Sequence, residues 1–545
     1  MKRTRNLGQL LALGLVTLLL TGLLAACGDS TATTTTVAST TAAVVGTTAA
    51  GATTAASAAA AKTTTAAGTT ATGATTVAAG TTTAASATTV AAGATTAASA
   101  TTTAAVAAPT PTAVAPIPQP AGSVKITFWY GLTGALGNVV QQTVNKYNSS
   151  QSKYYVEAIQ QPSYDDTINK LNTSLAGATL PNVAQIYDIG TQRMIDTKKI
   201  LPVQDFIDKE QLNIISDLEP AVASYYTVGG KLYSMPFNSS APVMYFDKNA
   251  FKEVGLDPEK KIWTYDEVLE AAKKLVKKDA SGKIIRGGVD FTLYSWIFEQ
   301  ELATQGAVFA APDNGRNARA TNLAFNNDAG TNWLNFLKKI QDDGLGRSWG
   351  RDGGANSSTR DAKFVTGETA ITFNSIAGLR GYISSAAQAG GKVDVGVAYI
   401  PRPTGAKGGV IIGGASFWIT NTGTPEQQAA SWDFVKWTAL PEIQAYWSSN
   451  TGYYPIRKGA YDVQEMKDTL AKYPQFNVAI EQLRATEPSS ATQGAVFGTF
   501  VSTRQAIEGA MEQFLAGKFP TAKAALDDAA SKSNDTLSEY NSTVK

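Results

Sequence analysis

The residue types in this sequence limit the chemistry that the protein can perform. The chain of 545 residues contains no histidine and one cysteine, Cys27. These counts exclude a histidine-dependent catalytic triad, a zinc site made of thiolates and imidazoles, and a disulfide within the chain. A metal site made of carboxylates, or a hydrolase with two catalytic carboxylates, is still compatible with the composition.

Carboxylates are therefore the first candidates for chemistry. Five lie in or near predicted elements: Asp165, Asp166, Asp188, Asp290 and Glu299. Their spacing matches no paired-carboxylate signature, and most are expected to be helix caps or solvated surface residues. A Walker phosphate loop is absent, and Gly413-Gly414 alone is a weak signal. Aromatic residues after position 123 suit sugar or polyol faces, although most should belong to the core.

The densest local pattern is the run from Gly230 to Ala250. Apolar residues up to Phe237 give way to the polar triplet Asn238-Ser239-Ser240, and Val243–Phe246 has the pattern of a buried strand. This triplet is a candidate for the point where the chain crosses between two lobes and turns polar groups toward a ligand. An ordinary loop between two strands is the alternative.

The elements around this run predict an α/β protein. Val124–Trp129 alternates as a strand, Tyr155–Ile159 and Asn182–Asp188 follow as strands, and amphipathic helices separate them. Ser163 is placed to cap the second of these helices. Alternating strands and helices predict a parallel sheet flanked by helices.

A second α/β region follows the polar triplet. Thr264 and Glu267 form a predicted capping box, and Thr424 with Gln427 forms another. Three strands are expected at 370–373, 393–400 and 411–419, and a helical tail is expected at 503–540. About 420 folded residues exceed the size of one usual core, so two lobes are expected.

The N-terminus has the features of an export signal and a tether. Residues 1–26 combine basic residues, an apolar run and small residues before Cys27, and Leu24-Ala25-Ala26-Cys27 resembles a bacterial lipobox. A lipoprotein signal peptide with a lipid on Cys27 is therefore expected; a plain signal peptide is the alternative. Residues 27–122 are a predicted disordered tether, rich in Ala and Thr and then in Pro, averaging roughly 50 Å as a coil.

The charge balance argues against nucleic acid as a partner. The formal net charge is +2. Removing Lys2, Arg3 and Arg5 with the leader gives a net charge of 2 − 3 = −1. A protein with this net charge lacks the excess of positive charge expected for binding a polyanion such as nucleic acid. A two-lobed domain outside a membrane most naturally binds a small molecule in its cleft. A surface hydrolase and a surface adhesin are the competing classes.

Six motifs spread over the folded part resemble one family. They are Ile126–Gly131, Tyr187–Thr191, Met235–Pro242, Ala250–Pro258, Ile411–Ser416 and Thr451–Ile456. From about Val124 onward the chain resembles the family 1 extracellular solute-binding proteins of ABC importers, and within them the members that bind glycerol 3-phosphate. The resemblance implies a two-lobed periplasmic-binding-protein-like fold of type II, with a hinge and C-terminal helices.

The resemblance also implies a set of ligand-binding residues. They are Tyr164, Asp188, Ser240, Trp296, Ser375, Gly414, Tyr453 and Arg504. Asp188 stands where the family usually has glutamate, and Leu293 stands where it has a second tryptophan. The planar fork of Arg504 suits a pair of phosphate oxygens.

The resemblance implies a function without catalysis or cofactors. The protein is expected to be lipid-anchored on the outer side of the cell membrane, to be a monomer, and to deliver glycerol 3-phosphate or a glycerophosphodiester to a membrane permease. A sugar or oligosaccharide ligand is the alternative. The solute-binding domain is expected at 123–545, with lobe 1 at approximately 123–238 and 412–484, and lobe 2 at approximately 239–411 and 485–545.

Overall fold

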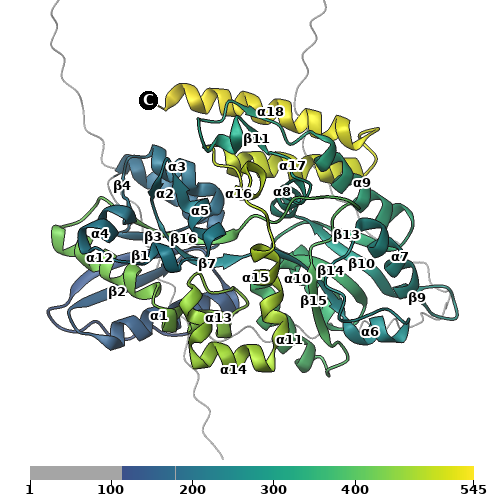
Figure 1. Cartoon of the computed structure of the whole chain (residues 1–545), viewed down its shortest axis with the longest axis horizontal. Coiled ribbons are helices and arrows are strands. Elements are labelled where there is room, and N and C mark those ends of the chain that lie inside the picture. Colours follow the sequence, from purple (N-terminus) through teal and green to yellow (C-terminus); the bar gives the residue numbers. More distant parts are fainter. Residues whose placement is uncertain (1–112, 178–179, 545) are drawn as a thin grey trace, which may run out of the picture. The chain divides into compact units, whose positions relative to one another are not determined.

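The computed structural model describes residues 113–177 and 180–544. The predicted signal peptide, Cys27 and most of the predicted tether lie outside these residues. The folded part belongs to one compact unit, Thr102–Lys545. Its strands form two main sheets, and helices pack around each of them (Figure 1).

The first sheet is built largely from the N-terminal part of the domain. Its strands, in spatial order, are β2 (Tyr154–Gln160), β1 (Val124–Tyr130), β3 (Val183–Tyr187), β16 (Gly413–Thr420) and β4 (Ile200–Leu201), with β7 (Met235–Ser240) also paired to β16. The strands β1, β2 and β3 are parallel, as predicted. The strand β16 returns from far along the chain and runs antiparallel to β3, β4 and β7, which the local pattern did not predict.

The second sheet is built from the middle of the chain. Its strands, in order, are β13 (Gly346–Arg351), β10 (Ile284–Leu293), β14 (Thr369–Ser375), β8 (Pro242–Asp247) and β15 (Val395–Tyr399), with β9 (Lys277–Lys278) paired to β10. Two short hairpins complete the strands: β5 (Thr227–Val228) with β6 (Lys231–Leu232), and β11 (Ala310–Ala311) with β12 (Asn322–Leu323).

The chain passes from the first sheet to the second at Ala241, between β7 and β8. The crossing therefore lies beside the predicted polar triplet. The triplet itself is not a loop, however, because Asn238, Ser239 and Ser240 form the end of strand β7 and are buried. Their polarity suggested a loop, whereas the pairing with β16 makes them a strand.

Helices cover the sheets and connect the strands. In sequence order they are α1 (Gly134–Ser150), α2 (Tyr164–Gly177), α3 (Thr191–Asp196), α4 (Val203–Glu210), α5 (Pro220–Tyr226), α6 (Lys248–Glu253), α7 (Tyr265–Leu275), α8 (Ser295–Thr304), α9 (Asp328–Asp342), α10 (Gly354–Val365), α11 (Leu379–Gln388), α12 (Pro425–Thr438), α13 (Pro441–Asn450), α14 (Gln464–Lys472), α15 (Val478–Arg484), α16 (Ser490–Gln493), α17 (Phe500–Leu515) and α18 (Ala522–Thr543). Short 3-10 turns add η1 (Asp188–Gly190), η2 (Ile215–Asp217), η3 (Asp313–Gly315), η4 (Ile376–Gly378), η5 (Lys458–Asp462) and η6 (Pro474–Asn477).

Each sheet has its own aromatic core. Around the first sheet, the Phe417 ring lies 4.8 Å from the Phe128 ring and 4.4 Å from the Phe237 ring, measured between centroids. Around the second, the Phe336 ring stacks on Tyr265 at 4.3 Å. Because all five side chains are buried, each contributes roughly 1.5–3 kcal/mol relative to exposure.

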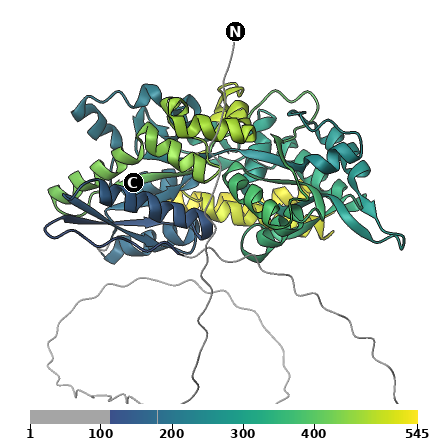
Figure 2. The ribbon, with the colours of Figure 1, turned by 90° about the horizontal axis from the view of Figure 1, so that it is seen from below.

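The last helix contacts both halves of the domain. On α18, drawn in yellow in Figures 1 and 2, the Tyr540 hydroxyl donates to Asp196 of α3 at 2.7 Å. On the same helix, Asn534 accepts a hydrogen bond from the Leu323 N–H of β12 at 2.7 Å. The helix α18 therefore links the two groups of elements. Within the described residues, no helix combines the length and the apolar character needed to cross a membrane.

The last residues of the predicted tether contact the folded domain. Within residues 113–120, the Val114 N–H donates to Asn138 at 3.2 Å, and the Asn145 amide donates to the Ala115 carbonyl at 2.8 Å. The Tyr155 hydroxyl donates to the Ile117 carbonyl at 2.9 Å. We call residues 113–120 the N-terminal strap, because these hydrogen bonds hold them against α1 and β2.

Both predicted capping boxes are confirmed. At the start of α7, the Thr264 hydroxyl accepts from the Glu267 N–H, and the Glu267 carboxylate accepts from the Thr264 N–H at 2.9 Å. At the start of α12, Thr424 and Gln427 make the same reciprocal pair. These hydrogen bonds satisfy helix N–H groups that would otherwise lack partners.

Replacing Thr264 with alanine is expected to lower the free energy of unfolding by about 1 kcal/mol, because the Glu267 N–H loses its acceptor. Urea unfolding of the two proteins measures the difference. Thr264→Ser keeps the hydroxyl and is the matched control. Equal stability of the alanine and serine variants would contradict the assignment.

Candidate functional site

An ion-pair cluster lies between the two groups of elements. Arg504 of α17 places Nη2 at 2.7 Å from Oε2 of Glu299 in α8, and at 3.9 Å from Oδ2 of Asp188 in η1. Asp188 follows β3 of the first sheet, whereas α8 directly follows β10 of the second. One guanidinium therefore faces carboxylates from both halves of the domain.

Burial sets the electrostatics of this cluster. Glu299 is 2% exposed, and burial raises its pKa to about 7, an effect that Arg504 opposes and Asp188 increases. Burial also raises the pKa of Asp188, against the attraction of Arg504. Burial alone would lower the pKa of Arg504, but the two carboxylates raise it. Arg504 is therefore fully charged, and Glu299 can change charge near neutral pH.

Two stacked tyrosines stand next to the cluster. The Tyr164 and Tyr187 rings are nearly parallel, with centroids 5.2 Å apart. The Arg504 guanidinium lies 5.9 Å from the centroid of the Tyr187 ring and 5.3 Å from that of Phe500. Tyr164 opens α2, and Tyr187 ends β3, so both stand at the end of the first sheet where Asp188 lies.

A relay of hydrogen bonds fixes Tyr164. The Gly131 N–H donates to Gln185 at 3.0 Å, Gln185 donates to Asn238 at 2.9 Å, and Asn238 donates to the Tyr164 hydroxyl at 2.9 Å. The Tyr453 hydroxyl interacts with both Tyr164 and Asn238. Because the Tyr164 oxygen accepts from Asn238, the Tyr164 proton is directed to the Tyr453 hydroxyl or to a ligand oxygen that replaces it.

Backbone glycines allow close packing beside these residues. The Trp296 ring lies against Gly413, where a Cβ atom would come within 2.4 Å of the ring. Gly414 has φ +108°, and a Cβ atom there would lie 1.8 Å from the Asn238 carbonyl oxygen of β7. No side chain fits at either position without displacing its neighbours, so both glycines are needed for this packing.

The two predicted serines lie near the cluster in different ways. Ser240 pairs with Gly413 in the sheet, and strand alternation puts its side chain on the same face as Asn238. Ser375 pairs with Pro242 and caps η4, where its Oγ accepts from the Ala377 N–H at 3.2 Å. The turn that Ser375 caps approaches Gly452, the neighbour of Tyr453. The Ser375 hydroxyl is therefore already engaged in capping η4.

The structure therefore brings six of the eight predicted residues into one neighbourhood, either directly or through Asn238 and Tyr187. These six are Tyr164, Asp188, Trp296, Gly414, Tyr453 and Arg504. Ser240 lies near them because its side chain is on the same face of β7 as Asn238. For Ser375, only the backbone of the turn that it caps approaches Gly452, the neighbour of Tyr453. Leu293, at the position of the family's second tryptophan, is buried at the end of β10.

Sequence reasoning did not assign a role to Glu299 or Asn238. Glu299 was one of five unassigned carboxylates, and its contact with Arg504 spans 205 positions in the chain. Asn238 belongs to the polar triplet, for which the sequence predicts a crossing between lobes or a loop. Within residues 113–177 and 180–544, no group of three or more acidic or cysteine side chains is arranged to hold a metal ion.

Two buried donors at this site lack partners. Among the described residues, Arg504 Nε and Trp296 Nε1 make no hydrogen bond. Buried polar groups are nearly always paired in native proteins. Together with the Asp188 carboxylate and the tyrosine hydroxyls, they could bind hydroxyl and oxyanion groups of a small polar molecule.

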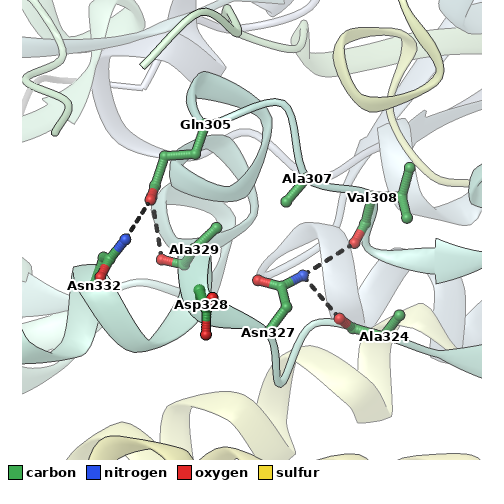
Figure 3. Close-up of a pocket in the computed structure, with 8 residues that line it drawn as sticks. All are labelled: Gln305, Ala307, Val308, Ala324, Asn327, Asp328, Ala329 and Asn332. Atoms are coloured by element: carbon green, nitrogen blue, oxygen red, sulfur yellow. Dashed lines mark hydrogen bonds between the residues drawn. The ribbon is translucent and has the colours of Figure 1, made fainter. Parts of the chain in front are cut away.

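A hollow of about 520 Å³ lies elsewhere, lined by residues that follow α8 and by residues at the start of α9 (Figure 3). Its side-chain amides are already engaged: Asn332 donates to Gln305 at 2.9 Å, Gln305 donates to the Ala329 carbonyl at 3.1 Å, and Asn327 donates to the Ala324 carbonyl at 2.9 Å. Since these groups bind one another, the Arg504 cluster has the stronger chemistry for a ligand.

The sequence matches a described family over most of the folded part. A family model described as bacterial extracellular solute-binding protein matches residues 142–477. The sn-glycerol-3-phosphate-binding periplasmic protein UgpB of Escherichia coli (strain K12) is 30% identical over 430 residues, covering 77% of this chain and 94% of that protein. The protein of the same name from Yersinia enterocolitica is 30% identical over 431 residues, with the same coverage.

Solved structures share the fold. UgpB from Mycobacterium tuberculosis, in complex with glycerophosphocholine, has a TM-score of 0.63 and 20% sequence identity, covering 77% of this chain and 100% of that one. Maltose-bound MalE3 of T. maritima has a TM-score of 0.62 and 19% identity, covering 76% of this chain and 100% of that one. The predicted two-lobed, periplasmic-binding-protein-like fold is thereby confirmed.

Proposed function

The chain belongs to the bacterial extracellular solute-binding proteins, and we propose that it captures glycerol 3-phosphate or a glycerophosphodiester for import. Proteins of this family bind small molecules outside the cell and deliver them to ABC permeases; they are not enzymes. The ligand proposal draws on the relatives' names and on the residues around Arg504.

The observation that supports this ligand class most is the surroundings of Arg504. A phosphate oxygen can accept from its unpaired Nε, and such a charge-assisted contact is about twice as strong as a neutral one. Asp188 and the Tyr164 hydroxyl, which lie at the end of the first sheet, can bind the ligand's glycerol hydroxyls. In this proposal Ser240, Ser375, Trp296, Gly414 and Tyr453 line the same site.

The mechanism we propose is hinge closure without covalent chemistry. The chain crosses between the sheets at Ala241 and again between β15 and β16. Rotation at such connections lets the two lobes close on a ligand. A ligand that contacts both Asp188 and Arg504 would favour an arrangement that holds these two groups close together, as they are here at 3.9 Å.

The charges at the site favour a diester over a monoester. Asp188, Glu299 and Arg504 together have a formal charge of −1 when ionised. A phosphomonoester bears between −1.5 and −2 charges at pH 7, whereas a phosphodiester bears only one. Because like charges repel strongly in a buried site, a glycerophosphodiester is the preferred candidate.

A sugar remains the second candidate. The stacked rings of Tyr164 and Tyr187, together with the Asp188 carboxylate, could bind sugar faces and hydroxyls without any phosphate. Several structural relatives are described with maltose or related sugars. For such a ligand, affinity would depend little on the charge of Arg504.

We also propose that Cys27 bears a lipid that anchors a monomeric protein to the outer side of the membrane. The lipobox-like sequence before Cys27 and the low-complexity composition that follows support this proposal. The N-terminal strap would then be the end of the tether, fixed on the first lobe by Asn138, Asn145 and Tyr155.

A thermal-shift screen tests the ligand class. Because a ligand that binds only the folded state stabilises it by RT ln(1 + [L]/Kd), saturation at 100 times Kd adds about 2.7 kcal/mol. We expect glycerophosphocholine or glycerol 3-phosphate to raise the melting temperature, and maltose to leave it unchanged. A shift with maltose and none with either phosphate compound would contradict the proposal and favour the sugar candidate.

A further inference from the structure

The guanidinium that a ligand phosphate would need already has a partner within the chain. Glu299 Oε2 lies 2.7 Å from Nη2 of Arg504, and the glutamate side chain is only 2% exposed. Asp188 stands 3.9 Å from the same nitrogen. An anionic ligand group that approaches Arg504 therefore meets a carboxylate that binds the same cation.

The charged and titratable groups around Glu299 come from several elements. Arg504 on α17, Asp188 on η1, Tyr225 on α5 and Arg316 after η3 interact with Glu299 itself, and Glu508 on α17, Tyr187 on β3 and Tyr294 before α8 interact with its partner Arg504. Arg316 uses its guanidinium on three backbone carbonyls, those of Tyr225, Gln493 and Gly494. Glu508 accepts hydrogen bonds from the Ser295 hydroxyl and N–H. Within the described residues, Arg504 is therefore the cation that contacts Glu299 directly.

On the basis of the proposed function, we propose that Glu299 competes with the ligand's anionic group for Arg504, so that an anionic ligand binds together with a proton. When a phosphate oxygen accepts from Nε of Arg504, Glu299 on Nη2 shares the guanidinium with a second anion and gains a negative neighbour. Its carboxylate then takes a proton from solvent and becomes a neutral carboxylic acid. Glu299 would thereby determine which ligand charge the site accepts at a given pH.

The direction of the pH effect follows from linkage. The pKa of Glu299 is about 7 while Arg504 faces it, and a phosphate bound to the same guanidinium raises that pKa further, because it places a second negative charge nearby. Affinity for a ligand whose phosphate contacts Arg504 is then constant well below pH 7 and falls by up to tenfold per pH unit above it. A neutral sugar does not compete with Glu299 for Arg504, so its affinity should change little over the same range.

Calorimetric titration with glycerophosphocholine between pH 6 and pH 8.5 tests this inference. A phosphodiester has no proton to lose in this range, whereas the second pKa of a phosphomonoester is near 6. Titrations at each pH in two phosphate-free buffers of different ionisation enthalpy measure the protons taken up. We expect an affinity at least tenfold weaker at pH 8.5 than at pH 6.5, and a proton uptake that is small at pH 6 and approaches one proton per ligand at pH 8.5.

Two matched variants assign the effect. Glu299→Gln keeps an acceptor for Arg504 but cannot take up the proton, so its affinity should be independent of pH and should exceed that of the wild type at pH 8.5. Glu301→Gln makes the same change two residues later on α8. There the carboxylate accepts from the Tyr265 hydroxyl at 2.6 Å, so this variant should keep the pH dependence of the wild type.

The possible failures can be told apart. If glycerophosphocholine binds with constant affinity and no proton uptake, the inference is overturned and the proposed function stands. If neither glycerophosphocholine nor glycerol 3-phosphate binds at any pH, the proposed ligand class fails and the inference with it. Proton uptake that persists in a folded Glu299→Gln variant would also overturn the inference. If the Glu299→Gln variant does not fold, the wild type alone can decide. Binding heats of the wild type that are the same in both buffers would show that no proton is taken up and would overturn the inference.

Discussion

Replacing Arg504 with alanine is expected to weaken binding of a glycerophosphodiester by roughly 10- to 100-fold, because hydrogen bonds to charged groups contribute about 1.5–3 kcal/mol. The same change removes the cation between Glu299 and Asp188. Breaking a buried ion pair by deleting one partner costs about 3–5 kcal/mol. Stability and affinity must therefore be measured separately, by urea unfolding and by calorimetry.

The stability loss from Arg504→Ala should depend on pH. Glu299 has a raised pKa, so its neutral form prevails below pH 7 and needs no cationic partner. We expect a larger loss at pH 8.5 than at pH 6. The double variant Arg504→Ala/Glu299→Gln should regain part of the stability without regaining ligand affinity. Unchanged affinity in the single variant would mean that the phosphate is bound elsewhere.

Replacing Gly414 with alanine is expected to lower the free energy of unfolding by about 3 kcal/mol or more. The new Cβ would lie 1.8 Å from the Asn238 carbonyl oxygen, and the backbone has φ +108°. Overpacking and positive-φ strain each cost roughly 1–3 kcal/mol. Because Asn238 orients Tyr164, we also expect weaker ligand binding.

Gly517→Ala is the matched control for this variant. Gly517 also has a positive φ, +74°, but a Cβ there would have no atom within 4 Å. Gly517→Ala therefore measures the effect of backbone strain without the steric clash. We expect it to lower the free energy of unfolding by only about 1 kcal/mol. If urea unfolding gives both variants the same stability, the close approach of β7 and β16 is not what requires a glycine at position 414.

Elements with local signals were predictable from the sequence. The strand β1, the capping boxes of α7 and α12 and the helical tail depend on alternation, helical periodicity and residues three positions apart, although the tail predicted at 503–540 is divided into α17 and α18. The same reasoning failed at Asn238, because polar residues in a buried strand look like a loop. Their environment is set by β16, which pairs with β7 from more than 170 positions further along the chain.

The site itself was predictable only through the family resemblance. The resemblance indicated Arg504 and Asp188, and the structure places Nη2 of Arg504 3.9 Å from Oδ2 of Asp188. Nothing in the sequence around Glu299 indicates that it faces Arg504, because helix α17 reaches α8 only in the folded chain. The ligand roles of all eight residues remain predictions.

A crystal structure with glycerophosphocholine tests the central claim most directly. The account predicts one ligand between the two sheets, with a phosphate oxygen at hydrogen-bonding distance from Arg504 Nε and glycerol hydroxyls at Asp188 and Tyr164. A ligand seated in the hollow beside Asn327, or one between the lobes whose phosphate does not contact Arg504, would contradict it.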